Sequence, residues 1–179
     1  MKAQFDPVKD NEECERIIRD TYQGVLAMVI EGQPYAVPLN HAYRDGRFYF
    51  HCANSGRKLN AIERNPNVTY VIKKYYGDSA ELAKAMKCHG HWESVIADGT
   101  ARIVSEDAEL IAGMKTYMAY YGHEDYQHGD DLLGRTRMII LDVAGMTARR
   151  EYDEFRTEYW YWEKDGQADA PARHHRRPT

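Results

Sequence analysis

Residues 35–65 read YAVPLNHAYRDGRFYFHCANSGRKLNAIERN, and this stretch decides the fold. Two β-rich runs, 35–43 and 48–52, flank Asp45 and Gly46, a pair that predicts a hairpin between two strands. Pro38 lies inside the first run, where it cannot donate to a ladder of hydrogen bonds. We therefore expect that strand to be an edge strand, a bulge or the lip of a cleft.

The next feature is the loop 53–56, which leads into a predicted helix at 57–65 that begins with Arg57 and Lys58. Two cations at the positive end of a helix dipole are unfavourable unless an anion binds there. Backbone N–H groups, the Ser55 hydroxyl and both cations could together bind a phosphate. The alternative is a pair of solvated surface cations. The sequence contains neither of the two common glycine-rich nucleotide loops, GxGxxG after a strand and GxxxxGK[ST].

The rest of the chain adds strands and short helices without βαβ alternation. A capping box formed by Asp10 and Glu13 begins a helix at 11–21. Strands are predicted at 25–30, 68–76, 92–104 and 137–151, with a kink at Gly99. The face of a further helix at 107–121 is formed by Leu110, Ile111, Met114, Met118 and Tyr121. Six strands with hairpin links predict an antiparallel barrel or sandwich.

Composition limits the function classes. The 179 residues, 43% of them hydrophobic, suffice for one core, so we expect one domain at 1–150 and an extension at 151–179 whose last residues are disordered. A net charge of −4 argues against a broad nucleic-acid-binding face. Cys14, Cys52 and Cys88 are not closely paired, which favours reduced thiols. The sequence predicts neither export nor a membrane span, so we expect a cytoplasmic protein.

Three ordered blocks carry a family resemblance: QPYAVPLNHAY at 33–43, FYFHCANSGRKLNAIERNPNVTYVI at 48–72 and HWESVIADGTARIV at 91–104. Together they resemble the nitroimidazole-resistance branch of the pyridoxamine 5′-phosphate oxidase-like flavoproteins, over roughly residues 14–147. The resemblance implies a mainly β fold, a six-stranded antiparallel split β-barrel with short flanking helices. It also implies a homodimer whose interface holds two flavins, usually FMN, with FAD as an alternative.

The resemblance assigns site residues as well. His51 would lie beside the flavin and the substrate and donate a hydrogen bond or a proton, acting as the catalytic residue. Its alternative is a histidine on a half-exposed strand face. The cofactor-binding residues would be Val37, Pro38, Leu39 and Asn40 along the isoalloxazine ring, Ser55, Arg57 and Lys58 at the phosphate, and Trp92, Glu93 and Ser94 at the partner subunit's flavin.

The predicted activity is that of an FMN-dependent oxidoreductase that reduces a small acceptor, such as a nitroaromatic or quinone-like compound. The alternatives are a non-catalytic flavin-binding or redox-sensing module, and a haem-binding split barrel using the histidines near Cys88. Oxidation of pyridoxamine phosphate is not predicted, because EYWYWEKDG lacks the arginine and histidine motif of those enzymes. The expected partners are a second copy of the chain and a small-molecule substrate, with no nucleic acid or membrane.

Other patterns in the sequence are weaker. The segment 88–91, CHGH, has ligand types for zinc or haem iron, but two ligands on one loop do not make a site, so no metal is predicted. His123 and His128 are one residue too far apart for a zinc helix, and we expect a loop there. Residues 159–162, YWYW, should pack on the barrel or on a partner. The polar segment 77–87 and the tail after 151 depart from the family pattern and leave substrate choice open.

Overall fold

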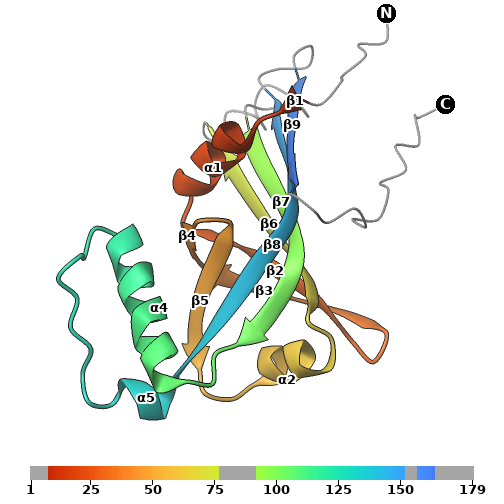
Figure 1. The fold of residues 1–179 in the computed structure, drawn as a ribbon. Coiled ribbons are helices and arrows are strands. Elements are labelled where there is room, and N and C mark those ends of the chain that lie inside the picture. The colour runs from red at the N-terminus through yellow and green to blue at the C-terminus, as the bar shows by residue number, and fades with distance from the viewer. Residues whose placement is uncertain (1–7, 77–91, 152–156, 164–179) are drawn as a thin grey trace, which may run out of the picture.

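The computed structural model describes residues 8–76, 92–151 and 157–163, and nine strands of this part form one sheet (Figure 1). The strands are β1 Val8–Lys9, β2 Gln23–Ile30, β3 Gln33–Asn40, β4 Ala42–Arg44, β5 Arg47–Ala53, β6 Asn67–Tyr75, β7 Trp92–Ile103, β8 Thr136–Glu151 and β9 Thr157–Glu163. The helices are α1 Asn11–Arg19, α2 Arg57–Arg64, α4 Asp107–Tyr120 and α5 Leu132–Arg135. The mainly β architecture with short helices is as predicted.

The strand pairings form a closed barrel. β2 pairs with β6, β6 with β7, β7 with β8, and β8 with β5, all antiparallel. β3 pairs with β2, whereas β4 pairs with β5, and only His41 separates β3 from β4. The predicted strand at 35–43 is therefore bent at His41 and joins both sides of a barrel. The additional strands beyond the predicted six arise from this bend and from β1 and β9.

Three local predictions are confirmed. Asp45 and Gly46, with φ angles of 51° and 74°, make the tight turn between β4 and β5. β3 is an edge strand, the last in the sheet order, as Pro38 requires. The kink at Gly99 is a bulge where the register with β8 shifts. A Cβ atom there would lie 2.1 Å from the carbonyl oxygen of Asp142, so only glycine fits.

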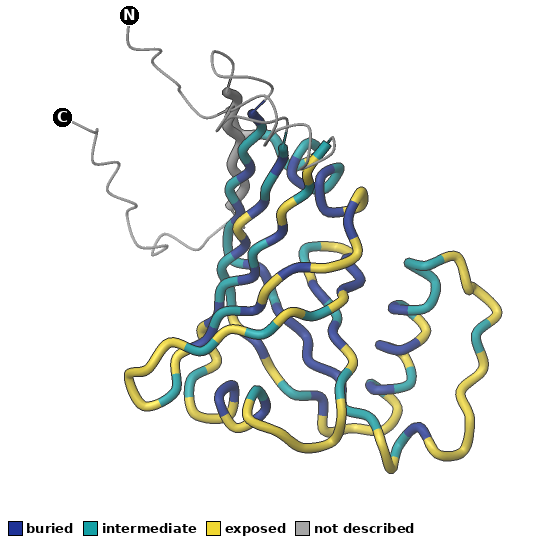
Figure 2. Tube along the Cα trace, turned by 180° about the vertical axis from the view of Figure 1, so that it is seen from behind, coloured by how far each residue is buried: buried dark blue, intermediate teal, exposed yellow. Residues whose placement is uncertain are grey.

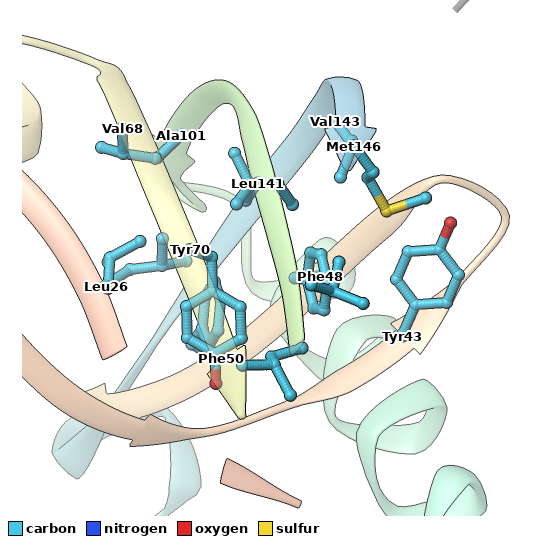
Figure 3. Close-up of a cluster of buried hydrophobic side chains, with 14 of the residues drawn as sticks. Leu26, Tyr43, Phe48, Phe50, Val68, Tyr70, Ala101, Leu141, Val143 and Met146 are labelled. Atoms are coloured by element: carbon cyan, nitrogen blue, oxygen red, sulfur yellow. The ribbon is translucent and has the colours of Figure 1, made fainter. Parts of the chain in front are cut away.

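Aromatic rings fill the barrel (Figure 3). The Tyr70 ring lies 5.0 Å from that of Phe48 and 4.8 Å from that of Phe50, and all three side chains are fully buried. α1 and α2 close the two ends, α1 with buried Ile17 and Ile18 (Figures 1 and 2). α2 contributes a buried stripe of Leu59, Ala61 and Ile62. Rings and end caps together give the barrel a rigid interior.

A second, smaller core lies outside the barrel, between β8 and the helices α4 and α5. Met138 and Ile140 of β8 contribute to it, and their neighbour Ile139 points into the barrel. The buried face of α4 differs from the predicted one: Gly113 and Tyr117 are buried, whereas Ile111, Met118 and Tyr121 are only partly covered. The reason is close approach, since a Cβ atom on Gly113 would lie 3.3 Å from the Met138 side chain.

Beyond residue 151 the chain adds β9, which pairs with β8 from Gly145 to Glu151 and with β1 in parallel. The packing of residues 159–162 on the barrel or on a partner stays a prediction, although the strand that contains them is paired on both sides. The predicted disorder at the end of the chain and the excursion at 77–87 lie outside the described residues, and the domain division stays a prediction. Within the described ranges, no helix has both the length and the apolar character needed to cross a bilayer.

Candidate functional site

The candidate site lies next to the bend at His41, where β4 is paired with β5 but the preceding strand β3 is not. The β4–β5 ladder starts at Ala42, opposite Tyr49; upstream of it β3 pairs only with β2, and residues 51–53 pair only with β8. Among the described strands, the facing edges of β3 and β5 are therefore unpaired. Leu39 is a partial exception, because its carbonyl accepts a hydrogen bond from the Tyr70 hydroxyl at 2.8 Å. Unpaired strand edges offer backbone donors and acceptors to a ligand.

The predicted isoalloxazine segment, residues 37–40, lies on this edge of β3. Val37 and Leu39 are half-buried and pack against the barrel core, while Pro38 and Asn40 are exposed on the opposite face. Side chains on the inner face fix the position of the strand. The backbone edge is then the part of β3 that remains available to a planar ligand.

The start of α2 lies at the lower end of this split (Figure 1). Its N-cap Gly56 has φ 136° and supplies no side-chain hydrogen bond, and the first turn contains no acidic residue. Ser55 and Arg57 are exposed beside it. The first amides of a helix have no acceptor within the helix, so this uncapped, basic end suits an anion. The residues present fit a phosphate group.

The positive charges of Lys58 and Arg137 both act on the Cys52 thiol. Cys52 pairs with Arg137 across the β5–β8 ladder. Burial raises the pKa of the Cys52 thiol above its ordinary value, and the positive charges of Lys58 and Arg137 oppose that rise. Neither cation forms an ion pair with a carboxylate of the described residues. Sequence reasoning missed Arg137, since only strand pairing brings it opposite Cys52.

Arg57 points elsewhere. Its guanidinium lies over the ring of Tyr35 on β3, with the carbon 4.4 Å from the ring centroid. The two cations that are adjacent in the sequence are thus separated in the structure. Lys58 acts on Cys52, whereas Arg57 is stacked on the Tyr35 ring of β3.

His51 lies on the outer face of β5, where its ring stands edge-on to Tyr117 of α4 at a centroid distance of 4.6 Å. Partial burial lowers the pKa of the imidazole below its ordinary value, so the neutral ring dominates at pH 7. An open groove of about 430 Å³ borders it, and Tyr126, Arg135 and Thr136 also line this groove. The lowered pKa favours a hydrogen-bond donor over a proton donor.

The three predicted residues at the start of β7 have side chains on two faces of the sheet. Trp92 and Ser94 point to the outer face of the sheet, where Trp92 lies between Lys73 and Arg149, 4.6 Å and 4.9 Å from its ring. Glu93 points inward and is only 2% exposed. It is bonded there to Arg16, Tyr76 and Arg150. Strand alternation separates the three side chains onto two faces.

No group of three or more histidine, cysteine or acidic side chains suited to a metal occurs among the described residues. The segment 88–91 lies outside them. His123 and His128 belong to the loop between α4 and α5, as predicted.

Fold and site together define a class: a mainly β split barrel with a basic, uncapped helix end beside its split. A family profile described as pyridoxamine 5′-phosphate oxidase matches residues 10–150. The chain therefore belongs to this family.

Individual relatives are more distant. "Uncharacterized protein RA0666" of Rhizobium meliloti (strain 1021) is 30% identical over 96 residues, which cover 53% of this chain and 55% of that protein. The chain thus matches about half the length of this curated relative.

Solved structures share the fold at low identity. A candidate 5-nitroimidazole antibiotic resistance protein from Bacteroides thetaiotaomicron has a TM-score of 0.67 at 21% identity, covering 81% of this chain and 86% of that one. A FAD-binding protein from Mesorhizobium loti has a TM-score of 0.61 at 21% identity, covering 80% and 96%. A FAD and haem binding protein from Mycobacterium smegmatis has a TM-score of 0.67 at 13% identity, covering 96% and 92%.

Proposed function

We propose that the chain is a flavin-dependent oxidoreductase that reduces a small acceptor, such as a nitroaromatic or quinone-like compound, in the cytoplasm. One observation carries the proposal. The uncapped start of α2, with no acid in its first turn, lies beside two cations that no described carboxylate neutralises. A phosphate at the end of a flavin would satisfy both the orphan amides and the charges.

Different residues would bind different parts of the cofactor. Ser55, Lys58 and Arg137 would bind the phosphate at the helix start. The backbone edge of residues 37–40 would lie along the isoalloxazine ring, on the side of β3 that faces away from its one paired strand, β2. A bound flavin supplies hydride or electron transfer, and the protein contributes binding, orientation and exclusion of water.

His51 would orient the acceptor. Its neutral imidazole borders the open groove and stands edge-on to the Tyr117 ring. A neutral histidine can donate a hydrogen bond to a nitro or quinone oxygen without first gaining a proton. The groove of about 430 Å³ suits a small molecule.

The proposal includes a homodimer. Val25, Val29 and Ile96 are exposed by 39%, 42% and 37% on the outer face of the sheet. The register places Pro38, Val25, Val71 and Ile96 next to one another in a single row. An exposed apolar row of this kind supports burial against a second copy of the chain.

Sedimentation should give a dimer for the wild-type protein, and Ile96→Asp should shift it to a monomer. A monomeric wild-type protein would contradict the proposed homodimer.

A second candidate is a flavin-binding module without turnover. Two of the structural relatives carry names that describe binding of FAD and no reaction. The haem alternative draws on relatives named for haem binding, but its predicted ligands at 88–91 lie outside the described residues.

The deciding experiment starts from the absorption spectrum of the purified protein, which distinguishes flavin, haem and neither. NADH, NADPH and dithionite are then added under anaerobic conditions, followed by a nitroaromatic or a quinone. Flavin bleaching and its reversal by the acceptor, with consumption of the acceptor, are expected for the oxidoreductase. Bound flavin that the acceptors do not reoxidise favours the binding module. A protein that takes up no flavin ends the proposal.

A further inference from the structure

The groove beside His51 lies between the end of β5 and α5 with the loop before it. Two contacts join these elements. Ala53 pairs with Thr136, the residue that follows α5, and the Asn54 side-chain amide donates to the Gly134 carbonyl at 2.8 Å. The end of β5 and α5 are thus held together by backbone pairing and a side-chain bond, and the groove is formed before a ligand arrives.

Among the described residues that line the groove, the charged side chains are Asp131 and Arg135. Nη1 of Arg135 lies 2.8 Å from Oδ2 of Asp131, and the two side chains are 78% and 68% exposed. An exposed ion pair of this kind contributes little to stability, so a ligand can replace one partner at small cost. The planar guanidinium can bind a ligand carboxylate through two parallel hydrogen bonds.

The surroundings of the groove favour an anion over a cation. Lys58 and Arg137 both act on Cys52, which lines the groove together with Arg135. A cofactor phosphate, with a charge of about −1.5 to −2, would offset Lys58 and Arg137 without reversing the sign. The electrostatic environment of the groove therefore stays neutral or positive, which suits a ligand carboxylate better than an ammonium group.

The β5–β8 register sets the distance between Arg135 and His51. Thr136, the residue after Arg135, pairs with Ala53, which lies two residues from His51 along β5. Two residues of a strand span about 7 Å. That span is comparable to a benzene ring with substituents on opposite carbons, and the half-buried Tyr126 adds an aromatic side chain to the same groove.

We infer that the groove selects aromatic acceptors that carry a carboxylate opposite the reducible group. The reducible oxygen accepts a hydrogen bond from His51, the ring lies beside Tyr126, and the carboxylate replaces Asp131 on Arg135. Asp131 is then an internal competitor that weakens binding of the anion. This inference rests on the proposed function, because it names the class of acceptor for the same site.

The test compares para-nitrobenzoate with its neutral counterpart para-nitrobenzamide, by calorimetric titration of the flavin-loaded protein. Wild type should bind the carboxylate about ten-fold more tightly than the amide, the scale of a charge-assisted hydrogen bond. Arg135→Gln should weaken binding of the carboxylate about ten-fold, and Asp131→Asn should tighten it about three-fold. Neither variant should change binding of the amide by more than about two-fold.

The matched control is Arg44→Gln, which removes an exposed arginine paired with Asp45 outside the groove and should leave both affinities unchanged. In steady-state reduction, Arg135→Gln should raise KM for para-nitrobenzoate and leave kcat unchanged, as expected for lost ground-state binding.

Two contrary results are distinct. Equal binding of the two compounds by wild type, or a preference for the carboxylate that Arg135→Gln retains, overturns the inference and leaves the proposed oxidoreductase. The titration measures binding without turnover, so reduction of neither compound overturns the proposed function itself, whatever the affinities are.

Discussion

His51 and Tyr117 meet edge to face between β5 and α4, with ring centroids 4.6 Å apart and ring planes at 82°. Tyr117 is 5% exposed, and its hydroxyl lies 3.5 Å from that of Tyr121, which donates to the His41 carbonyl at 2.8 Å. The contact thus links the candidate catalytic histidine to the bend at which β3 leaves β5. α4 is therefore part of the site as well as a cover for β8.

Removing the Tyr117 ring should change the titration of His51. In Tyr117→Ala the imidazole gains solvent, so its pKa should rise toward the ordinary 6.5, followed by NMR of the ring protons. Tyr117→Phe keeps the ring and should leave the pKa unchanged. The alanine variant should also lose about 3–5 kcal/mol of stability, so circular dichroism must show it folded; if it is not, Tyr117→Leu replaces it. An unchanged His51 pKa in the folded variant would contradict the contact.

Lys58→Ala should reduce flavin affinity by about 1.5–3 kcal/mol, the scale of a charge-assisted hydrogen bond. Arg137→Ala should cost a similar amount if both cations face the phosphate. Fluorescence titration measures both. Lys115→Ala serves as the matched control for loss of one positive charge. An affinity that stays at the wild-type value in both site variants would refute the phosphate assignment.

His41 predicts a dependence of stability on pH. It is fully buried, and its Nδ1 lies 3.0 Å from the Tyr70 oxygen; since that hydroxyl donates to Leu39, Nδ1 is the donor. Burial lowers its pKa from 6.5 to about 4, against a smaller opposing effect of the Ile18 carbonyl. Between these values the unfolded chain binds a proton that the folded chain does not. Stability from this group is therefore complete above pH 6.5 and is lost as pH falls toward 4.

The expected loss between pH 7 and pH 5 is about 2 kcal/mol in the free energy of unfolding, measured with urea. His41→Gln retains a donor but does not titrate, so its loss over the same interval should be smaller by about that amount. Equal slopes in the two proteins would show that His41 is not the group responsible.

Glu93 is expected to stabilise the barrel end instead of binding a cofactor directly. Burial raises the pKa of its carboxyl, but hydrogen bonds from Tyr76, Arg150 and Arg16 outweigh it and hold the pKa below the ordinary value. Glu93→Gln removes one of the two carboxylates that Arg16 and Arg150 share, while Glu13 stays paired with both, and it should cost about 1.5–3 kcal/mol of stability. The exposed Glu63→Gln should cost less than about 0.5 kcal/mol. A stable Glu93→Gln protein with weakened flavin binding would restore the direct role.

The sequence predicted those features that depend on neighbouring residues. The Asp45–Gly46 turn, the edge position of Pro38 and the bulge at Gly99 each follow from the backbone freedom or the missing donor of one residue type. The basic helix start could also be read locally, because a loop and the helix it enters are contiguous. Strand alternation, applied to residues 92–94, would have separated Glu93 from its two neighbours.

The contacts between residues that are distant in the sequence were decided by the tertiary structure alone. Arg137 reaches Cys52 through β5–β8 pairing, Tyr35 reaches Arg57 through the packing of α2 on the barrel, and Tyr117 reaches His51 through a helix buried by Gly113. These partners are far apart in the chain, and no local propensity encodes their approach. Their contacts arise only when burial of the aromatic core closes the strands into a barrel.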